Sequence, residues 1–170
     1  MMTEGDGPGM TTRAAEERDA PVLLRLIHEL AAYEGQADVC VVTEPALRSA
    51  LFGPRPLADA ILAEDDGEPV GFALFFPYFS PYPGVPGLFM ELLYVRPERR
   101  GLGVGRALLR RVAQIAVEQG AGRLEWGVLK ENAPTIRFYA GLGAELVDDF
   151  MACRLEGETL RRVADGQAAR

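Results

Sequence analysis

The chain has 170 residues with 25 acidic and 18 basic side chains, which give a formal net charge of -7. This length suits one domain with an adequate core, and the acidic balance argues against a nucleic-acid partner. No apolar run is long enough to span a bilayer and no secretory signal is visible, so we expect a soluble, cytoplasmic protein with no membrane partner. Two cysteines (Cys40, Cys153) and one histidine (His28) favour neither a disulfide framework nor a metal centre.

The first half of the chain alternates helical and extended patterns. Residues 1–9 have the composition of a disordered leader, and residues 10–13 predict a short strand. A helix is expected to begin near Ala20, with Asp19 as its N-cap, and to end near Tyr33. A second short helix is expected over 45–51. Apolar runs at 60–64 and 69–76 flank an acidic, glycine-containing turn and predict a β-hairpin.

The second half continues the alternation. Residues 77–87 hold four prolines and predict a loop or irregular strand ends. Strands are expected over 88–95, 123–129, 145–147 and 151–155, with helices from Val104 and over 132–141, and a flexible tail over 163–170. Together these elements predict an α/β fold, a mixed central sheet of about six to seven strands with helices on both faces.

A loop rich in glycine and arginine joins the strand over 88–95 to the following helix. Alternate glycines let the backbone turn tightly and let a ligand approach the amides. The first amides of a helix lack internal partners and lie at the positive end of its dipole, so they form an anion site. The pattern indicates a phosphate or pyrophosphate ligand, and its residues are Arg99, Arg100, Gly101, Leu102, Gly103, Val104, Gly105 and Arg106.

The spacing of the glycines selects among phosphate-binding motifs. A dinucleotide fingerprint needs a different third spacing, and a P-loop needs Lys followed by Ser or Thr. Arg100-x-x-Gly103-x-Gly105 instead resembles the pyrophosphate-binding signature of the GCN5-related N-acetyltransferases (GNAT), which bind acetyl-coenzyme A. The alternative is a helix start after a glycine-rich turn with no ligand.

The resemblance extends from about Thr12 to Leu155 and is greatest to the diamine (spermidine/spermine or thialysine) acetyltransferases. It is carried by a segment ending in Tyr33-Glu34, by 70–73, by the glycine loop and by a segment from Asn132 to Ala144. It implies a single GNAT-like N-acetyltransferase domain over 10–162, acetyl-CoA as co-substrate, a small-molecule amine acceptor and a homodimer.

The same resemblance implies roles for individual residues. Tyr139 matches the tyrosine that protonates the departing sulfur, and Glu91 matches the carboxylate that takes the proton of the amine. Because Glu91 leaves an apolar strand, we expect it to be partly buried with a raised pKa. Besides the glycine loop, the residues implied to bind acetyl-CoA are Leu93, Tyr94, Val95, Asn132, Thr135 and Tyr139. The residues implied to bind the acceptor are Tyr33, Glu34, Tyr82, Glu91, Glu125 and Trp126.

Each role has a structural alternative. The alternative for Tyr139 is a packing aromatic beside Phe138, and the alternative for Glu91 is a salt-bridge partner at the sheet edge. Tyr33 and Glu34 fit a frayed helix end. Asn132 also fits the N-cap of its helix.

The chain departs from the polyamine enzymes at two acidic positions. It has Ser80-Pro81-Tyr82 where they have an acidic residue before Pro-Trp, and Leu92 follows Glu91 where they have a second acid. Asp148 and Asp149 are candidates for a later acidic contact. We therefore expect a smaller amine, or an amino acid with a side-chain amine, to be preferred over spermine. The alternatives are a GNAT enzyme acting on a protein or antibiotic amine, and a non-catalytic CoA-binding module.

Overall fold

The computed structural model describes residues 9–148 and 151–167. They fall into two compact units, of which the first ends at Gly127 and the second begins at Val128. The leader predicted over 1–9 lies outside the described residues except for Gly9, and so does Asp149.

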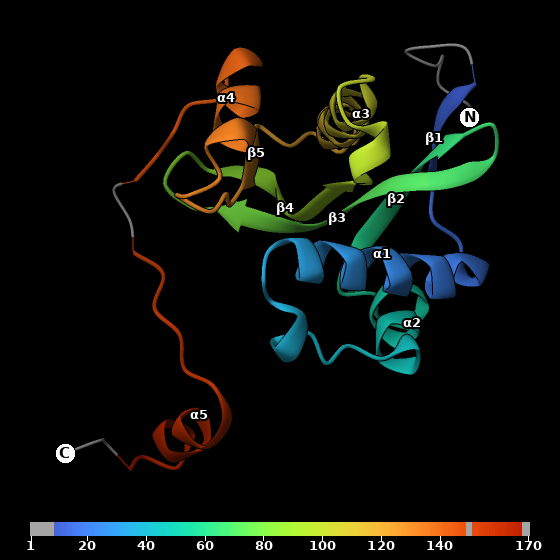
Figure 1. Ribbon diagram of the computed structural model, residues 1–170. Helices are drawn as coiled ribbons and strands as arrows, with labels where there is room; N and C mark the ends of the chain where they lie inside the picture. The colour runs from blue at the N-terminus through green and yellow to red at the C-terminus, as the bar shows by residue number, and fades with distance from the viewer. Residues whose placement is uncertain (1–8, 149–150, 168–170) are drawn as a thin grey trace. The chain divides into compact units, whose positions relative to one another are not determined.

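The first unit is built on a five-stranded sheet in the order β1-β2-β3-β4-β5 (Figure 1). Neighbouring strands are antiparallel from β1 to β4, whereas β5 runs parallel to β4, so the sheet is mixed as predicted. The expected count of six to seven strands is wrong for the described residues. The strands are β1 (Met10–Ala14), β2 (Asp59–Asp65), β3 (Glu68–Ser80), β4 (Val85–Val95) and β5 (Arg123–Trp126).

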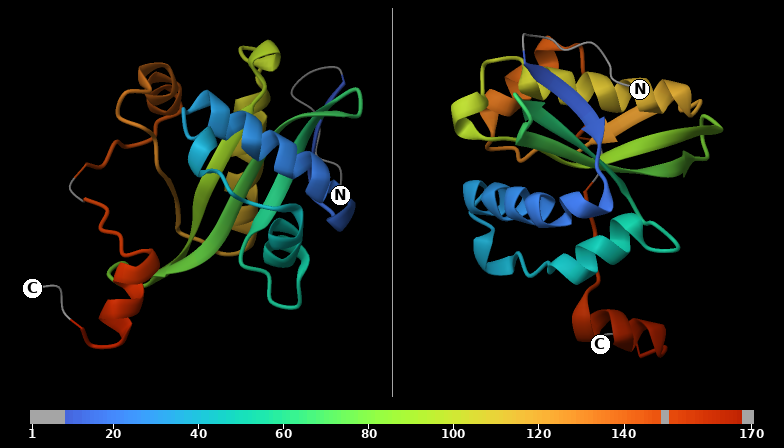
Figure 2. Two further views of the ribbon diagram at one scale, coloured as in Figure 1. Left: turned by 60° about the horizontal axis from the view of Figure 1, so that its bottom comes forward. Right: turned by 90° about the vertical axis from the view of Figure 1, so that its right-hand side faces the viewer.

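Helices cover both faces of this sheet, as predicted (Figure 2). On one face lie α1 (Ala20–Tyr33) and α2 (Glu44–Phe52), and on the other lies α3 (Val104–Glu118). Short 3-10 turns are η1 (Glu17–Asp19), η2 (Ala37–Val39) and η3 (Pro97–Arg99). The second unit holds α4 (Ala133–Gly141) and α5 (Gly157–Ala164), and α5 includes the first two residues of the predicted tail.

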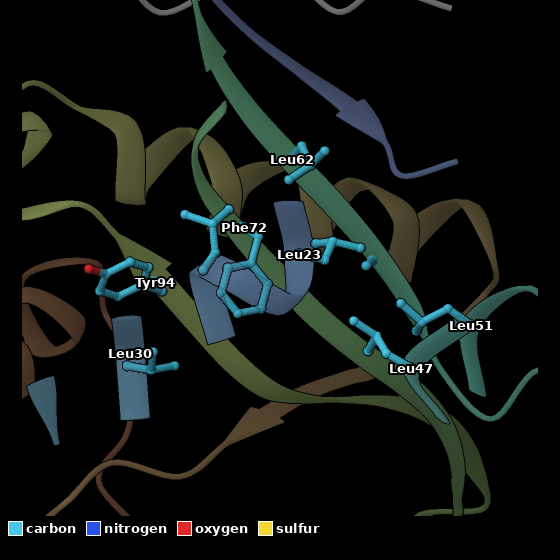
Figure 3. Packing of buried hydrophobic residues seen from close by; sticks show 9 residues of the cluster. Leu23, Leu30, Leu47, Leu51, Leu62, Phe72 and Tyr94 are labelled. Carbon is cyan, nitrogen blue, oxygen red and sulfur yellow. The ribbon is translucent and has the colours of Figure 1, made fainter. Parts of the chain in front are cut away.

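The core of the first unit has one apolar layer on each face of the sheet. Leucines of α1 and α2 pack on Leu62, Phe72 and Tyr94, which project from successive strands (Figure 3). Across the sheet, the buried stripe of α3 comprises Val104, Ala107, Leu108, Leu109, Val112 and Ala116. Burying a leucine or valine side chain contributes about 1.5–3 kcal/mol, so packing of α1 and α3 stabilises the sheet from opposite faces.

The two closing strands predicted over 145–147 and 151–155 are wrong. Residues 144–148 and 151–156 have no regular structure, and Leu146, Val147 and Met151 are exposed. A strand is stable only when a neighbour satisfies its backbone groups, and none of the described strands pairs with these residues. Apolar content alone therefore does not produce a strand here.

The proline-rich stretch 77–87 is mostly strand rather than loop. Pro77 pairs with Leu88 and Pro86 pairs with Phe79, so only residues 81–84 form the turn between β3 and β4. The register of β2 on β3 reaches no further than Phe75, which leaves one side of β3 without a strand partner at Pro77 in the described fold. A proline is tolerated in a strand at such an edge. The predicted strand over 123–129 is likewise shorter and ends at Trp126.

Asp19 occupies the N-cap position of α1, but its side chain makes no capping hydrogen bond. Its carboxylate instead accepts two hydrogen bonds from the Arg13 guanidinium, at 2.6 and 2.9 Å, and one from the Glu16 amide at 2.7 Å. The Arg13 hydrogen bonds hold the pKa of Asp19 below its ordinary value, against the opposing effect of burial. Since Arg13 also binds Glu64 at 2.9 Å, this arginine joins β1, β2 and the start of α1.

Candidate functional site

The C-terminal half of β4 is a strand edge with backbone groups that point away from β3. The Arg96 amide donates to the Val70 carbonyl at 3.0 Å, which fixes the alternation of the antiparallel ladder. Tyr94 therefore directs its backbone groups to β3, whereas Leu93 and Val95 direct theirs to the opposite side. On that side β5 pairs with β4 only from Gly87 to Met90, so in the described residues no strand covers Leu93 or Val95.

Glu91 lies at an irregularity in the β3–β4 ladder. Leu74 pairs with Leu92 and Phe75 pairs with Met90, so Glu91 is an extra residue with no partner on β3. Such a bulge bends the strand and changes the direction of its side chains. The expectation that Glu91 is partly buried is wrong, because its side chain is exposed. The bulge, which sequence periodicity did not indicate, turns Glu91 outward from an otherwise apolar strand.

The glycine loop follows the β4 edge directly. Gly101 and Gly103 have φ of +77° and +89°, in the left-handed region that favours glycine, and a Cβ added at either would meet no atom within 4 Å. Gly103 is the N-cap residue of α3 and has no side chain to occupy the first amides of that helix. Val104 anchors the helix start in the core with 1% exposure, while Leu102 is 63% exposed. The loop therefore presents open backbone at the positive end of a 15-residue helix.

The arginines around this loop have different partners. Arg99 forms an ion pair with Asp65 at 3.1 Å, and Arg106 is exposed in the first turn of α3. The Arg100 side chain donates from Nε to the Val95 carbonyl at 2.9 Å, and its Cζ lies 4.1 Å from the centre of the Tyr33 ring. The structure thus brings together four sequence-predicted features: the β4 edge, the glycine loop, Arg100 and Tyr33.

Two of the predicted acceptor residues lie at the end of α1. Tyr33 is the last residue of the helix and is 52% exposed, and Glu34 is the C-cap. Neighbouring protein atoms remove part of the water around the Glu34 carboxylate, which raises its pKa above the ordinary value although the side chain keeps an exposed face. The Arg100 guanidinium and the Glu34 carboxylate thus both lie at this end of the helix, the first against the Tyr33 ring.

The remaining acceptor candidates of the first unit lie on other elements. Tyr82 is fully exposed in the β3–β4 turn, and Trp126 ends β5 half-buried. Glu125 accepts a hydrogen bond from the Tyr78 hydroxyl and faces Arg123 at 3.4 Å. Tyr78, which the sequence did not indicate, lies on β3 and reaches Glu125 of β5 by crossing Gly87 of β4. A Cβ added at Gly87 would lie 2.5 Å from the Tyr78 ring. No local sequence signal shows this contact, because it depends on strand register.

The second unit carries three predicted residues on one helix. Asn132 caps α4, since its side-chain oxygen accepts a hydrogen bond from the Thr135 amide at 3.3 Å. The capping role proposed as an alternative for Asn132 is therefore confirmed. Tyr139 is 5% exposed, and its ring centre lies 5.2 Å from that of Phe138.

The features of the first unit fit an elongated ligand that ends in phosphate groups. The strand edge offers the amide and carbonyl of Leu93 and the amide of Val95 to an amide-containing arm, whereas the Val95 carbonyl already accepts a hydrogen bond from Arg100. The open glycine loop at the start of α3 offers further amides to an anion. No three metal-ligating side chains cluster in the part of the chain that the structure describes, and none of its helices is long and apolar enough to cross a membrane.

An α/β fold with a strand edge that leads into an anion-binding helix start defines a class of proteins that bind phosphate-bearing cofactors. The chain matches the acetyltransferase (GNAT) family over residues 27–144, which span parts of both units, and it belongs to this family. It is accordingly an acetyl-CoA-dependent N-acetyltransferase, as the glycine loop predicted.

Curated relatives match over most of their length. The chain is 36% identical to a thialysine N-epsilon-acetyltransferase from Bos taurus over 163 residues, covering 89% of this chain and 95% of the relative. It is 29% identical to an L-ornithine N5-acetyltransferase from Arabidopsis thaliana, covering 89% and 86%.

Solved structures share the fold. An integron cassette protein from the mobile metagenome of V. cholerae matches with a TM-score of 0.78 and 25% identity, covering 93% of this chain and 99% of that one. An aminoglycoside acetyltransferase from an uncultured soil metagenomic sample, solved with sisomicin, matches with a TM-score of 0.74 at 16% identity, covering 88% and 98%.

Proposed function

We propose that this enzyme transfers the acetyl group of acetyl-CoA to a primary amine of a small diamine or an amino acid with a side-chain amine, by direct attack in a ternary complex. The observation that carries the proposal is that the backbone groups of Leu93 and the Val95 amide, which no described strand pairs, lead directly to the open glycine loop. Relatives named for thialysine and ornithine acetylation support the class of acceptor.

The donor would be held by backbone groups and by positive charge. The β4 edge binds the amide-containing arm and the thioester carbonyl, and preorganised amides stabilise the negative charge that develops on that oxygen. Gly101 to Gly105 and the first turn of α3 bind the pyrophosphate, with Arg100 and Arg106 nearby. The family resemblance also assigns Asn132 and Thr135, in the second unit, to acetyl-CoA.

The transfer forms a C–N bond and breaks the thioester C–S bond, so one proton must leave the amine and one must reach the sulfur. Glu91 accepts the amine proton through water, in keeping with its exposed position on the bulge. Tyr139 donates a proton to the departing thiolate, because a phenol with an ordinary pKa of about 10 matches the basicity of a thiolate. The products are the N-acetylated amine and free coenzyme A.

The acceptor is proposed to lie beside Tyr33 and Glu34. Tyr82, Glu125 and Trp126, which the resemblance also assigns to the acceptor, lie toward the other end of β4, where β5 pairs with Gly87 to Met90. The acidic pair that suits a long polycation is missing, since Ser80 and Leu92 stand at the two positions concerned. Of the retained carboxylates, Glu125 is already engaged by Tyr78 and Arg123. The loss of these two acidic positions favours a compact acceptor with one or two amines over spermine.

The proposal includes a cellular location and an oligomeric state. A cytoplasmic location is supported by Cys40 and Cys153, which are both unpaired, as is usual in a reducing compartment. A homodimer is supported by the exposed apolar side chains Leu146, Val147 and Met151, which a second copy would remove from water.

A steady-state panel of thialysine, ornithine, putrescine, lysine, spermidine and spermine tests the acceptor class. Release of coenzyme A gives the rate, and the mass of each product shows the single added acetyl group. We expect kcat/KM for at least one small amine to exceed that for spermine. A higher value for spermine than for every smaller amine contradicts the assignment, and binding of acetyl-CoA without acetylation of any amine favours a non-catalytic module.

A further inference from the structure

The Arg100 side chain contacts three groups that come from two elements of the first unit, α1 and β4. Its Cζ lies 4.1 Å from the Tyr33 ring centre and 5.8 Å from the Tyr94 ring centre, and its Nε donates to the Val95 carbonyl. Arginine stacks well on aromatic rings because its planar cation is weakly hydrated. The arginine of the glycine loop thus rests on the last residue of α1 rather than extending freely into solvent.

A second arginine also joins α1 to the chain around η3. Arg96 binds Glu29 through two hydrogen bonds, of 3.0 and 2.9 Å. Glu29 and Tyr33 are four residues apart on α1 and share one face of the helix, while Arg96 and Arg100 flank the turn η3. We call these four residues the α1 clamp: Glu29, Tyr33, Arg96 and Arg100.

The Tyr33 ring has no other role that the described packing explains. It is 52% exposed and lies outside the buried core cluster, whereas the Tyr94 ring is buried and packs 6.4 Å from Phe72. Without the Tyr33 ring, one face of the guanidinium would return to water. Arg100 would then keep the Val95 carbonyl and the more distant Tyr94 ring, and its long side chain would regain rotamer freedom.

We propose that Tyr33 is a positioning residue for the donor: its ring holds the Arg100 guanidinium beside the β4 edge and the glycine loop, ready for the phosphates of acetyl-CoA. The proposal rests on the proposed function and adds a donor role to a residue that the family resemblance assigns to the acceptor.

Calorimetric titration of coenzyme A into the amine-free protein tests the role. An exposed cation–π contact contributes enough for Tyr33→Leu to weaken coenzyme A binding about two- to five-fold. Tyr33→Phe keeps the ring and should restore the affinity of the original protein. Tyr33 is exposed at a helix end, so both variants should remain folded in the absence of ligand, and loss of the one exposed contact in Tyr33→Leu should lower Tm by no more than about 4 °C.

A double-mutant cycle shows whether Tyr33 acts through Arg100. In an Arg100→Met background, Tyr33→Leu should cause no further loss of affinity, because the cation that the ring holds is gone. An unchanged Kd for Tyr33→Leu, or an equal loss with and without Arg100, overturns the inference. Failure of the original protein to bind coenzyme A would refute the proposed function itself, so the two outcomes are distinguishable.

Discussion

Gly103 offers a direct test of the glycine loop, because its substitution separates a cost in stability from a cost in binding. Its φ of +89° is unfavourable for any residue with a Cβ, yet an added Cβ would meet no atom within 4 Å. Gly103→Ala therefore introduces backbone strain without a clash. The methyl group would stand at the N-cap of α3, where an anion must approach the amides.

Both costs can be estimated from this geometry. Left-handed backbone costs about 1–2 kcal/mol for a residue other than glycine, which lowers Tm by about 2–8 °C in a protein of this size. Losing one hydrogen bond to a charged phosphate costs at least about 1.4 kcal/mol, which is about tenfold in Kd. At an acetyl-CoA concentration of about 100 times the original Kd, the stabilisation by ligand then falls from about 2.7 to about 1.4 kcal/mol.

Thermal unfolding with and without acetyl-CoA measures both quantities, and Gly120 provides a matched control. Gly120 follows the other end of α3 with φ of +71°, and an added Cβ there also meets no atom within 4 Å. Gly120→Ala should lower Tm by a similar amount and keep the full increase in Tm that acetyl-CoA causes. Gly103→Ala should keep only about half of that increase. Equal rises for the two variants would refute the assignment of the loop to the cofactor.

Three further predictions concern charge and proton transfer. Arg100→Glu should raise the Kd for acetyl-CoA at least about tenfold with little change in Tm, because the side chain is exposed; calorimetry that finds the original affinity in a folded variant contradicts this. Tyr139→Phe should lower kcat by about 10²–10⁴ while acetyl-CoA still binds, and an unchanged rate would remove Tyr139 from the mechanism. Asp19→Asn should lower the free energy of unfolding by about 1.5–3 kcal/mol at pH 7. Because Arg13 lowers the pKa of Asp19, the stabilisation is present at neutral pH and is lost as the pH falls below about 4. Urea unfolding should therefore show the two proteins converging toward pH 2, and a difference that stays constant with pH excludes this cause.

The features predicted well from the sequence depend on interactions between residues close together in the chain. The stripe of α1, the start of α3, the hairpin of β2 and β3 and the Asn132 cap are each determined within a few residues, by periodicity, turn chemistry or capping. The glycine loop belongs to the same group, because its conformation needs only residues without a Cβ at Gly101 and Gly103. It also indicated the family that the comparison then showed.

Strand pairing and charge placement were decided by the tertiary structure. The continuation of β3 through Pro77, the bulge at Glu91 and the crossing of Tyr78 over Gly87 depend on which residue of one strand faces which residue of the next. Two apolar segments predicted as strands have no pairing neighbour among the described strands and are irregular.

The arginines show most clearly which features the sequence predicts and which depend on the tertiary structure. The sequence by itself determined that several positive charges gather around residues 96–106, from which an anion site is predicted there. Only the tertiary structure decided that the Asp19 carboxylate binds Arg13 instead of capping α1, and that the Arg100 guanidinium lies against the Tyr33 ring. The physical reason is that a long, flexible arginine side chain can bind any of several acceptors or rings within its reach. Folding determines which of these groups lie close enough to bind.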